Sequence, residues 1–486
     1  MSSGRTARTD GELLNWNRVV ESIQQSDCDI CRAIVLGQDG ETLLLLASQS
    51  GFLLPSVEIP RWQRHTESFT AAMRSEWGCE VICLFTPGVP AATDHSNGHH
   101  YQVMECWQQA GTHHPQTVWR PVSSLTQDSF SDEKDYLATL QSLEECKAHR
   151  LGAAPGPFAE PGWFAELRDW VGETIGPLGL QLKSTFRQLN AAPSFSLIRF
   201  DTDGPAIWFK AVGEPNEKEF PITLTLAHLF PNQVAPVLST QPSWNGWLSP
   251  EVAGTNLGES QDIEHWRSAA GALARLQVES IGRQTAILES GARDLRLSVL
   301  PNIVAPFLDA MTQLMEQQSK VPPPALSRSE LHRLEEQIQD ALVFIQALEI
   351  PDTLGHRDLN PGNIIVRRGG CTFLDWAEAC VAHPFFSFEY LLEHFRRAIG
   401  APLSVETEFA ASYVREWEAV LPRARVEAAL ARTPLLAAFA YAAGSDLWCD
   451  RHRIRIPATP GYLRALTRRM NREAKQLTDR RTRWLS

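Results

Sequence analysis

The sequence predicts an α+β protein in which a β-rich part precedes a larger and mainly helical part. Between residues 30 and 108, short apolar runs rich in Val, Ile and Leu alternate with turn signals, a pattern typical of strands. From residue 262 to residue 448, apolar residues recur with helical spacing. A chain of 486 residues is long enough for two or three domains, each with its own core.

Composition and charge narrow the classes of protein. The formal net charge of -12 makes nucleic acid an unlikely partner. No apolar run is long enough to cross a membrane and no signal peptide is evident, so we expect a cytoplasmic protein without a membrane partner. The nine cysteines are an odd number scattered along the chain, which indicates reduced thiols. Cys28, Cys31, Cys79 and Cys83 could form a zinc site, but buried structural thiols are the favoured interpretation.

The charge is unevenly distributed along the chain. Residues 451–486 contain eleven Arg and Lys, and their only acids are Glu473 and Asp479. This C-terminal segment is therefore strongly basic, while the rest of the chain is strongly acidic. Three interpretations stay open: a solvated helix face, a surface for an anionic substrate or for the acidic body of the protein, and a nucleic-acid contact.

A first domain is predicted over residues 28–150, after a polar N-terminal extension of residues 1–27. A hairpin is expected between Ile30 and Leu46, with its turn at Gln38-Asp39-Gly40. A helix from Thr66 to Trp77 would end at Gly78, a residue type that suits the left-handed C-cap. Further strands are expected at Val81–Phe85 and Tyr101–Gln108, and a closing helix at Ser131–His149.

This first domain resembles a Nudix domain whose motif has degenerated. The resemblance covers residues 28–148, and the helix before Gly78 stands where that family carries several metal-binding carboxylates. Ala71-Ala72 and Ser75 replace charged residues of the motif, Leu54–Glu58 replaces its glycine turn, and Glu76 is the helix carboxylate that remains. One carboxylate cannot hold the divalent ions that such hydrolysis needs. The resemblance therefore implies a Nudix-like α/β domain that does not hydrolyse, and that either binds a small ligand or braces its neighbour.

A second domain is predicted over residues 163–486, after a linker of small residues and prolines at residues 151–162. It opens with a helix from Trp163 to Thr174, followed by strands at Ser196–Phe200 and Ala206–Ala211. Ser327 and Glu330 form a capping box at the start of a later helix. The helices of this domain are expected at Asp262–Ser280, Asn302–Gln318, Leu331–Leu348, Glu389–Ile399, Thr407–Glu418, Arg425–Ala431 and Leu435–Trp448.

The strongest functional signal lies between residues 356 and 375. Asp358 and Asn363 flank the turn signal Asn360-Pro361-Gly362. The apolar run Ile364–Val366 predicts a strand that turns and returns to Asp375, so the hairpin would bring Asp375 beside Asn363. In a kinase-type phosphotransferase the first Asp deprotonates a hydroxyl, while the Asn and the second Asp hold Mg²⁺ against nucleotide phosphates.

Such a site also needs a cation for the nucleotide phosphates and an acid that holds the cation. Lys210 ends an apolar strand and Glu219 opens the next helix, so these two residues are the candidates. The loop expected at residues 189–196 has no glycine, and the hydroxyls of Ser194 and Ser196 would replace backbone amides at the phosphates. An extended connector after Pro250 places the backbone of Glu251 and Val252 where an adenine edge could bind; the two lobes would be residues 163–250 and 251–486.

Residues 163–480 resemble aminoglycoside phosphotransferases and choline kinases. The resemblance rests on Trp208–Lys210, the Glu219 helix, the His356–Asn363 segment and Leu374–Trp376 followed by His383–Phe386. It implies a bilobal protein-kinase-like fold, the cofactors ATP and Mg²⁺, and a small-molecule hydroxyl as the phosphate acceptor. Carried over by position, Asp358 is the catalytic base, Asn363 and Asp375 bind the metal, Lys210 and Glu219 position the phosphates, and His356 props the loop.

Two residues depart from the family pattern. Arg357 stands where the family usually has Gly, and Ser387 stands where an Asp commonly braces the catalytic loop. Neither change removes a reacting group, but the second could loosen the loop. A pseudokinase that binds nucleotide as a scaffold is one alternative, and a protein kinase, supported only by the His-Arg-Asp sequence, is another.

The acceptor and the oligomeric state stay open at this level. Acidic side chains in the helical part could receive a cationic acceptor, although solvated helix faces explain them equally well. These residues are Glu259, Asp262, Glu264, Glu389 and Glu393.

Overall fold

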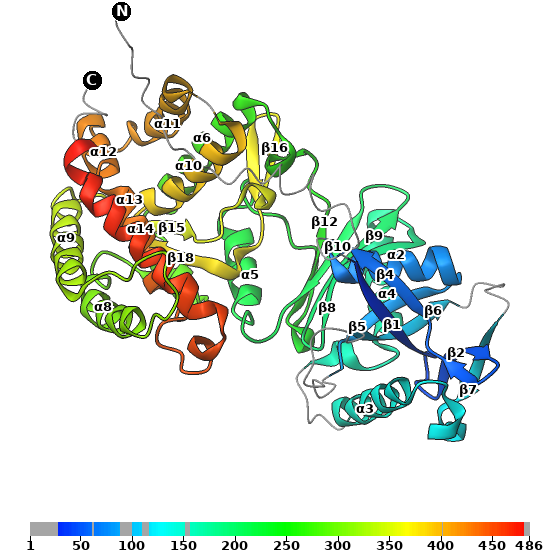
Figure 1. The fold of residues 1–486 in the computed structure, drawn as a ribbon. Coiled ribbons are helices and arrows are strands. Elements are labelled where there is room, and N and C mark those ends of the chain that lie inside the picture. Colours follow the sequence, from blue (N-terminus) through cyan, green and yellow to red (C-terminus); the bar gives the residue numbers. More distant parts are fainter. Residues whose placement is uncertain are drawn as a thin grey trace, which may run out of the picture. The chain divides into compact units, whose positions relative to one another are not determined.

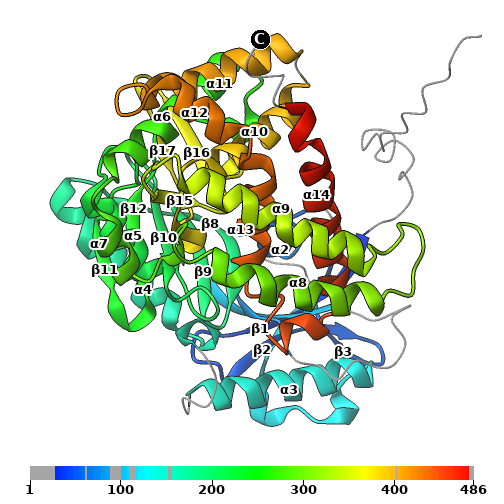
Figure 2. The same ribbon diagram turned by 90° about the vertical axis from the view of Figure 1, so that its left-hand side faces the viewer.

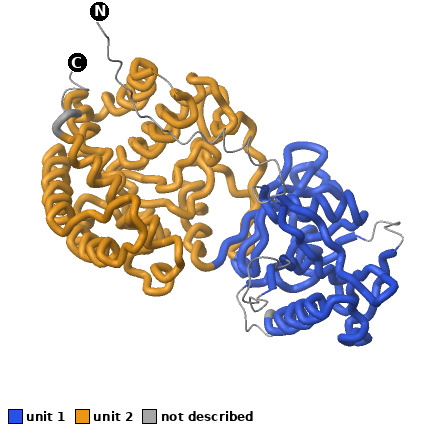
Figure 3. Tube along the Cα trace, viewed as in Figure 1, with its two compact units in different colours: residues 1–213, 242–244 blue, residues 214–241, 245–486 orange. Residues whose placement is uncertain are grey.

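The computed structural model describes residues 28–60, 63–87, 100–108, 116–150, 156–400 and 402–480. These residues have a mixed α+β structure and form two compact units (Figures 1 and 3). Unit 1 contains the described residues up to Gly213 together with Pro242–Trp244, and unit 2 contains the rest. The predicted N-terminal extension and residues 151–155 of the predicted linker lie outside the described residues.

The first sheet of unit 1 has seven strands. Their order is β3-β2-β1-β6-β5, with β4 paired to β1 and β7 paired to β2. The pair β1 and β6 is parallel, and the other pairs of this sheet are antiparallel. The strands are β1 (Cys28–Leu36), β2 (Thr42–Ser48), β3 (Gly51–Leu53), β4 (Ser56–Pro60), β5 (Glu80–Phe85), β6 (His100–Gln108) and β7 (Thr117–Pro121), and the helices of this region are α2 (His65–Trp77) and α3 (Glu133–Arg150).

Local signals in the sequence account for several of these elements. The predicted hairpin is confirmed, because the Gly37 N–H donates to the Thr42 carbonyl at 2.9 Å and the turn residue Gly40 has φ +71°. The predicted end of α2 is also confirmed: Gly78 has φ +63° and donates to the carbonyl of Arg74. Of the four cysteines considered as zinc ligands, Cys28 is exposed and the other three are buried.

Three antiparallel strands of a second, five-stranded sheet belong to unit 1: β8 (Leu182–Ala192), β9 (Phe195–Thr202) and β10 (Ile207–Ala211). Helix α4 (Trp163–Ile175) buries Phe164, which stacks against Phe200 of β9. The loop expected at residues 189–196 is shorter than predicted, because β8 and β9 continue through most of it and only Pro193 and Ser194 lie between them. The polar sequence of β8 concealed this strand.

A buried glutamine joins the two sheets of unit 1. Gln188 of β8 accepts from the Cys83 N–H at 2.7 Å and donates to the Cys83 carbonyl at 2.9 Å. Cys83 lies on β5, the strand at the end of the seven-stranded sheet, so the amide completes backbone hydrogen bonds that this edge would otherwise leave open. Arg187 also pairs with Glu67 of α2. Contacts therefore join the two regions between which the sequence predicted a linker.

Unit 2 is mainly helical. Its helices are α5 (Glu219–Leu229), α6 (Ile263–Glu279), α7 (Gln284–Glu289), α8 (Pro301–Glu316), α9 (Arg328–Gln346), α10 (Phe385–Ile399), α11 (Leu403–Trp417), α12 (Arg423–Leu430), α13 (Thr433–Ala443) and α14 (Ala458–Arg480). Its strands are β11 (Ser239–Gln241), β12 (Gly246–Pro250), β13 (Thr255–Asn256), β14 (Arg293–Leu295), β15 (Thr353–His356), β16 (Ile364–Arg367), β17 (Gly370–Phe373) and β18 (Ala379–Ala382). The capping box at Ser327 and Glu330 is confirmed. Two small sheets, β14-β18-β15 and β13-β16-β17, lie within this unit.

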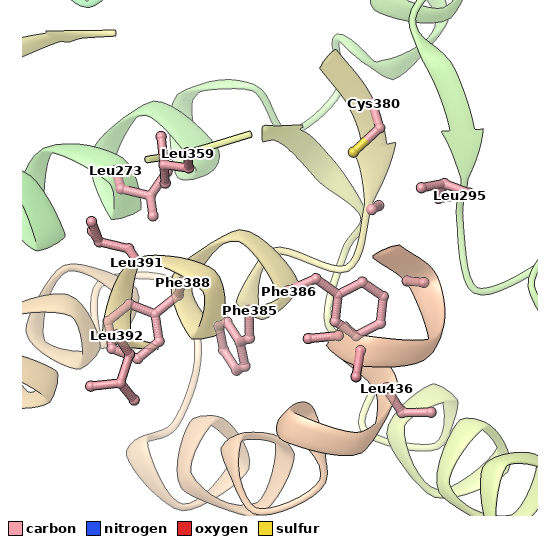
Figure 4. Close-up of a cluster of buried hydrophobic side chains, with 14 of the residues drawn as sticks. Leu273, Leu295, Leu359, Cys380, Phe385, Phe386, Phe388, Leu391, Leu392 and Leu436 are labelled. Carbon is pink, nitrogen blue, oxygen red and sulfur yellow. The ribbon is translucent and has the colours of Figure 1, made fainter. Parts of the chain in front are cut away.

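The core of unit 2 lies around α10. Phe385, Phe388 and Leu391 of this helix are buried (Figure 4). Helix α10 packs against α13, and α13 packs against the C-terminal helix α14 (Figure 2). Both small sheets are therefore held against one continuous apolar core, since Leu354 of β15 and Phe373 of β17 belong to the same cluster.

Most of the described part of the basic C-terminal segment forms helix α14, which binds the body of unit 2. Within α14, Arg464 donates to the Leu314 carbonyl at 3.2 Å, and Lys475 pairs with Glu330 at 3.2 Å. Arg469 pairs with Glu393 of α10. Of the three interpretations of this segment, contact with the acidic body is the one that these ion pairs support. No helix among the described residues has both the length and the apolar character to cross a membrane.

Glu105 of β6 provides a test of the packing in unit 1. Its side chain is 0% exposed, and Oε2 accepts from the Gly162 N–H at 2.8 Å. Oε1 is buried without a hydrogen-bond partner in the described part of the chain. Burial raises the pKa of this carboxyl to about 7.

We predict that Glu105→Gln stabilises the protein at pH 8 and leaves it unchanged at pH 4. Because the folded-state pKa lies above the unfolded value, the wild type loses stability as pH rises through 7, on the order of 2 kcal/mol. Urea unfolding at several pH values measures the slope, and Glu144→Gln on the exposed face of α3 is the control. Parallel pH profiles for the wild type and Glu105→Gln would contradict the assignment.

Candidate active site

Strand β15 holds the segment that carries Asp358. His356, the last residue of β15, pairs with Ala379 of β18, and the Arg357 N–H donates to the Glu378 carbonyl at 3.1 Å. On the other side of Asp358, Leu359 is 0% exposed and lies in the core of unit 2. Asp358 itself is partly exposed. Anchors on both sides therefore fix the backbone while the carboxylate stays accessible.

The turn after Asp358 is built by two asparagines. Asn360 Oδ1 accepts from the Gly362 N–H at 2.8 Å, an Asx turn in which Pro361 takes the next position. Asn363 donates its Nδ2–H to the Asp358 carbonyl at 3.0 Å. The predicted turn is confirmed, and its hydrogen bond holds the Asn363 side chain against the backbone of Asp358.

The predicted hairpin is also confirmed. Strands β16 and β17 are antiparallel, with Ile364 opposite Phe373, and the Leu374 N–H donates to the Asn363 carbonyl at 2.8 Å. Asp375, the next residue, has φ +62°, a left-handed conformation that costs energy for a residue with a Cβ. The backbones at Asn363 and Asp375 are thus adjacent, as the sequence predicted.

His356 connects the two halves of this arrangement. Nδ1 of the imidazole accepts from the Asp358 N–H at 3.2 Å, so the proton lies on Nε2, which donates to the Leu374 carbonyl at 3.0 Å. The ring is 1% exposed and lies against Trp376, with 4.7 Å between ring centroids. Burial lowers the pKa of His356, which keeps the ring neutral. This side chain therefore fixes the position of Asp358 relative to the segment that carries Asp375.

The two departures from the family pattern are both accommodated. The Ser387 hydroxyl accepts from the His356 N–H at 2.9 Å, so a shorter side chain performs the brace. Arg357 is 9% exposed and binds Glu378 at 2.5 Å and the Tyr441 carbonyl at 3.1 Å. The loop therefore has specific partners in Glu378, which directly precedes β18, and on α10 and α13.

Polar neighbours orient the Asp358 carboxylate. The hydroxyl of Tyr390, on α10, donates to Asp358 Oδ1 at 3.4 Å, and Asn360 Nδ2 lies 3.5 Å from both carboxylate oxygens. Burial and the neighbouring Arg397 lower the pKa of His394, so this histidine is neutral near Asp358. Sequence reasoning missed Tyr390, because its sequence position gives no motif signal.

The oxygen atoms near the hairpin suit a hard divalent cation. The Asn363 Nδ2 atom is engaged with the Asp358 carbonyl, which leaves Oδ1 as the free ligand atom of the amide. Asp375 is exposed and adds a carboxylate. Among the described residues no three His, Cys, Asp or Glu side chains gather as a metal site. Mg²⁺ fits this donor set, because it commonly binds through few protein oxygens, with phosphates and waters completing its octahedron.

The residues of unit 1 that the sequence suggested for the nucleotide phosphates lie at one end of strands β8, β9 and β10. Lys210 pairs with Leu197 and is partly exposed, and Ser194 forms the tip of the β8–β9 hairpin. The Phe158 N–H donates to the Pro193 carbonyl at 3.0 Å, which holds this tip. Ser196 is 0% exposed on the face that also carries Ile198.

Three further residues that the sequence suggested for nucleotide binding belong to unit 2. Glu219 is the first residue of α5, as predicted, and is 1% exposed. Glu251 and Val252 directly follow β12; Glu251 is exposed and Val252 is partly buried.

Comparison with known proteins gives one family match. Residues 243–426 match the phosphotransferase enzyme family, a segment that contains Asp358, Asn363 and Asp375. No curated protein matches the sequence.

Solved structures resemble this chain at low identity. The macrolide 2'-phosphotransferase MphH from Brachybacterium faecium is 15% identical with a TM-score of 0.42, and 61% of this chain and 96% of that chain are covered. Choline kinase LicA from Streptococcus pneumoniae is 12% identical with a TM-score of 0.41, covering 65% and 99%. The spectinomycin phosphotransferase APH(9)-Ia, solved with ADP and spectinomycin, is 13% identical with a TM-score of 0.38, covering 64% and 98%. These likenesses are too distant to carry a substrate to this chain.

We predict that Ser387→Ala destabilises the protein by about 1–3 kcal/mol, because it leaves the buried His356 N–H without its acceptor. Urea unfolding measures the change. Ser412→Ala on α11 removes a hydroxyl that bonds only within its own helix, so it should cost less than about 0.5 kcal/mol. Equal stabilities of the two variants would show that Ser387 does not brace the loop.

Proposed function

We propose that the protein is an ATP-dependent phosphotransferase that transfers the γ-phosphoryl group to a hydroxyl of a small molecule. The observation that carries the proposal is the arrangement around His356, which holds Asp358 beside the hairpin that carries Asn363 and Asp375. The family match over residues 243–426 supports the same class of reaction.

Asp358 acts as the base in this proposal. Its carboxylate is partly exposed and is oriented by Tyr390 and Asn360, so one oxygen is positioned to accept the proton of an acceptor hydroxyl. His356 does not exchange protons, because both ring nitrogens are engaged with backbone atoms and the ring is buried. It is a positioning residue.

Asn363 and Asp375 hold Mg²⁺ in this proposal through Asn363 Oδ1 and the Asp375 carboxylate. When bound, the ion would neutralise charge on the nucleotide phosphates. Lys210 contributes a further positive charge at the phosphates, and Glu219 fixes that lysine. A buried carboxylate such as Glu219 is stable only with hydrogen-bonding or cationic neighbours, which suits this role.

Side-chain exposure decides which of the two serines we place at the nucleotide phosphates. Ser194 at the hairpin tip is partly exposed and is the hydroxyl that we place at the phosphates, since the Ser196 side chain is buried. The backbone of Glu251 and Val252 is proposed to meet the adenine edge. For the N-terminal part we propose a bracing role without hydrolysis, because Gln188 joins its sheet to the β8–β9 hairpin.

Nucleotide binding without transfer is the second candidate function. The glycine-free tip at Pro193–Ser194 favours it, because the bond to Phe158 limits the movement with which such a tip could close over phosphates. A measurement of phosphotransfer turnover distinguishes an active phosphotransferase from a protein that only binds nucleotide.

We predict that Asp358→Asn lowers phosphotransfer by about 10²–10⁴-fold, since it removes the general base. Binding of ATP with Mg²⁺ should stay within a factor of about three, as measured by thermal shift or calorimetry. Asp309→Asn, an exposed change on α8, is the control and should leave both quantities unchanged. Normal turnover of Asp358→Asn would remove this residue from the mechanism.

We predict that Asp375→Asn weakens the Mg²⁺ dependence of ATP binding. Loss of one charged ligand should raise the Mg²⁺ concentration at half-maximal stabilisation by at least about tenfold, given that even indirect changes around metal ligands cost 10–100-fold. Titration of Mg²⁺ at fixed ATP, followed by thermal shift, measures this. ATP stabilisation that needs no divalent ion, in the wild type, would argue against the proposed metal site.

A further inference from the structure

A cavity of about 280 Å³ lies within unit 2; His356 and Arg357, which directly precede Asp358, are in its lining, whereas Asp358 itself is not. Helices α10, α13 and α14 contribute most of its wall, and His356 and Arg357 contribute the part below the catalytic loop. Tyr390 belongs to this wall, and its hydroxyl is the group that bonds Asp358 at 3.4 Å. A molecule in the cavity would therefore lie within one side chain of the proposed base.

Three tyrosines give the cavity an aromatic wall with hydroxyl groups. Tyr390 and Tyr441 are stacked with their ring centroids 5.8 Å apart, and the Tyr462 hydroxyl donates to the Tyr441 hydroxyl at 3.1 Å. Burial raises the pKa of Tyr390 and of Tyr462, so both stay protonated at neutral pH. The wall thus combines ring faces with neutral O–H groups.

The acidic residues of the cavity are ion-paired. Glu393 accepts from both Arg397, at 3.3 Å, and Arg469. Glu389 pairs with Arg396 at 3.4 Å. A cationic acceptor would have to compete with these arginines for the carboxylates, which argues against Glu389 and Glu393 among the five acidic residues considered for a cationic acceptor.

Arg357 adds a buried donor. Its Nη1 and Nη2 atoms bind Glu378 and the Tyr441 carbonyl, but its Nε atom is buried without a hydrogen-bond partner among the residues that the structure describes. That Nε atom is enclosed by protein, so it does not itself face a ligand in the cavity. The Tyr441 hydroxyl, which accepts from Tyr462 and keeps its own proton to donate, and the guanidinium groups of Arg397 and Arg469 are the donors that the lining offers beside the aromatic faces.

We propose that this cavity receives the phosphate acceptor, and that the acceptor is an oxygen-rich hydroxyl compound without positive charge, of the sugar or sugar-acid class. The inference rests on the proposed phosphotransferase function and names its substrate class. Ring oxygens and hydroxyls would accept from Tyr441, Arg397 and Arg469, while apolar C–H faces would pack on the aromatic rings. From the cavity the acceptor would extend one hydroxyl past Tyr390 to Asp358, which takes the hydroxyl proton as the acceptor oxygen bonds to the γ-phosphorus and the bond from that phosphorus to the leaving ADP oxygen breaks.

The test compares sugars that share one ring and differ in one charge. The full-length protein with ATP and Mg²⁺ is assayed for ADP release and for thermal shift with glucose, galactose and mannose, with the corresponding uronic acids and amino sugars, and with choline. We expect at least one neutral sugar or uronic acid to be used with kcat/KM at least tenfold above that of its amino counterpart and of choline.

Two variants tie that preference to the cavity. Tyr462→Ala should raise KM for the preferred sugar at least fivefold and leave KM for ATP unchanged. Glu393→Gln removes one carboxylate from two arginines and should shift the preference toward the uronic acid. The control is Glu408→Gln on α11, which removes the carboxylate paired with Arg267 of α6 and should not shift the preference. A thermal unfolding scan of each variant confirms that it is folded.

The possible failures are distinguishable. Absence of both ATP-dependent stabilisation and ADP release would overturn the proposed function, and this inference with it. Transfer that prefers amino sugars or choline would overturn only the substrate class, as would ATP binding without binding or use of any sugar or uronic acid. An unchanged sugar KM in Tyr462→Ala would overturn the cavity as the acceptor site.

Discussion

The arrangement of the site depends on one buried imidazole. His356 accepts a hydrogen bond from the backbone of Asp358 and donates one to the backbone of Leu374, so a single rigid ring spans two segments that are otherwise joined through a hairpin. The two bonds require the neutral tautomer with the proton on Nε2, because a second ring proton would face the Asp358 N–H. Burial favours that neutral form. The proposed base and the proposed metal ligands are therefore fixed relative to each other by packing as much as by chain connectivity.

Elements whose causes are local could be predicted from the sequence. The Asn360–Gly362 turn, the β16–β17 hairpin, the Ser327 capping box and the Gly78 helix end all depend on residues within a few positions of each other. These local signals are sufficient to predict that Asn363 lies next to Asp375.

What the sequence could not predict depends on distant partners. Strand β8 has a polar sequence, and it is completed by the bonds of Gln188 to Cys83 of another sheet, more than a hundred positions away. The contact of Tyr390 with Asp358 arises because α10 packs beside the loop. The sequence marked position 387 as the place of a brace but not that the Ser387 hydroxyl would still bind the His356 N–H, since a serine hydroxyl has many possible partners.

The arginine at position 357 and the basic helix α14 belong to one electrostatic arrangement. A glycine at this position would leave Glu378 and the Tyr441 carbonyl without the donor that now joins the loop to α13. Arg469 of α14 neutralises Glu393 on the opposite wall of the same cavity. The excess of positive charge near the C-terminus thus compensates carboxylates that would otherwise make the cavity attract cations. Because these ion pairs lie beside the Asp358 loop, the charge of the C-terminal helix bears on which molecule could present a hydroxyl to the proposed base.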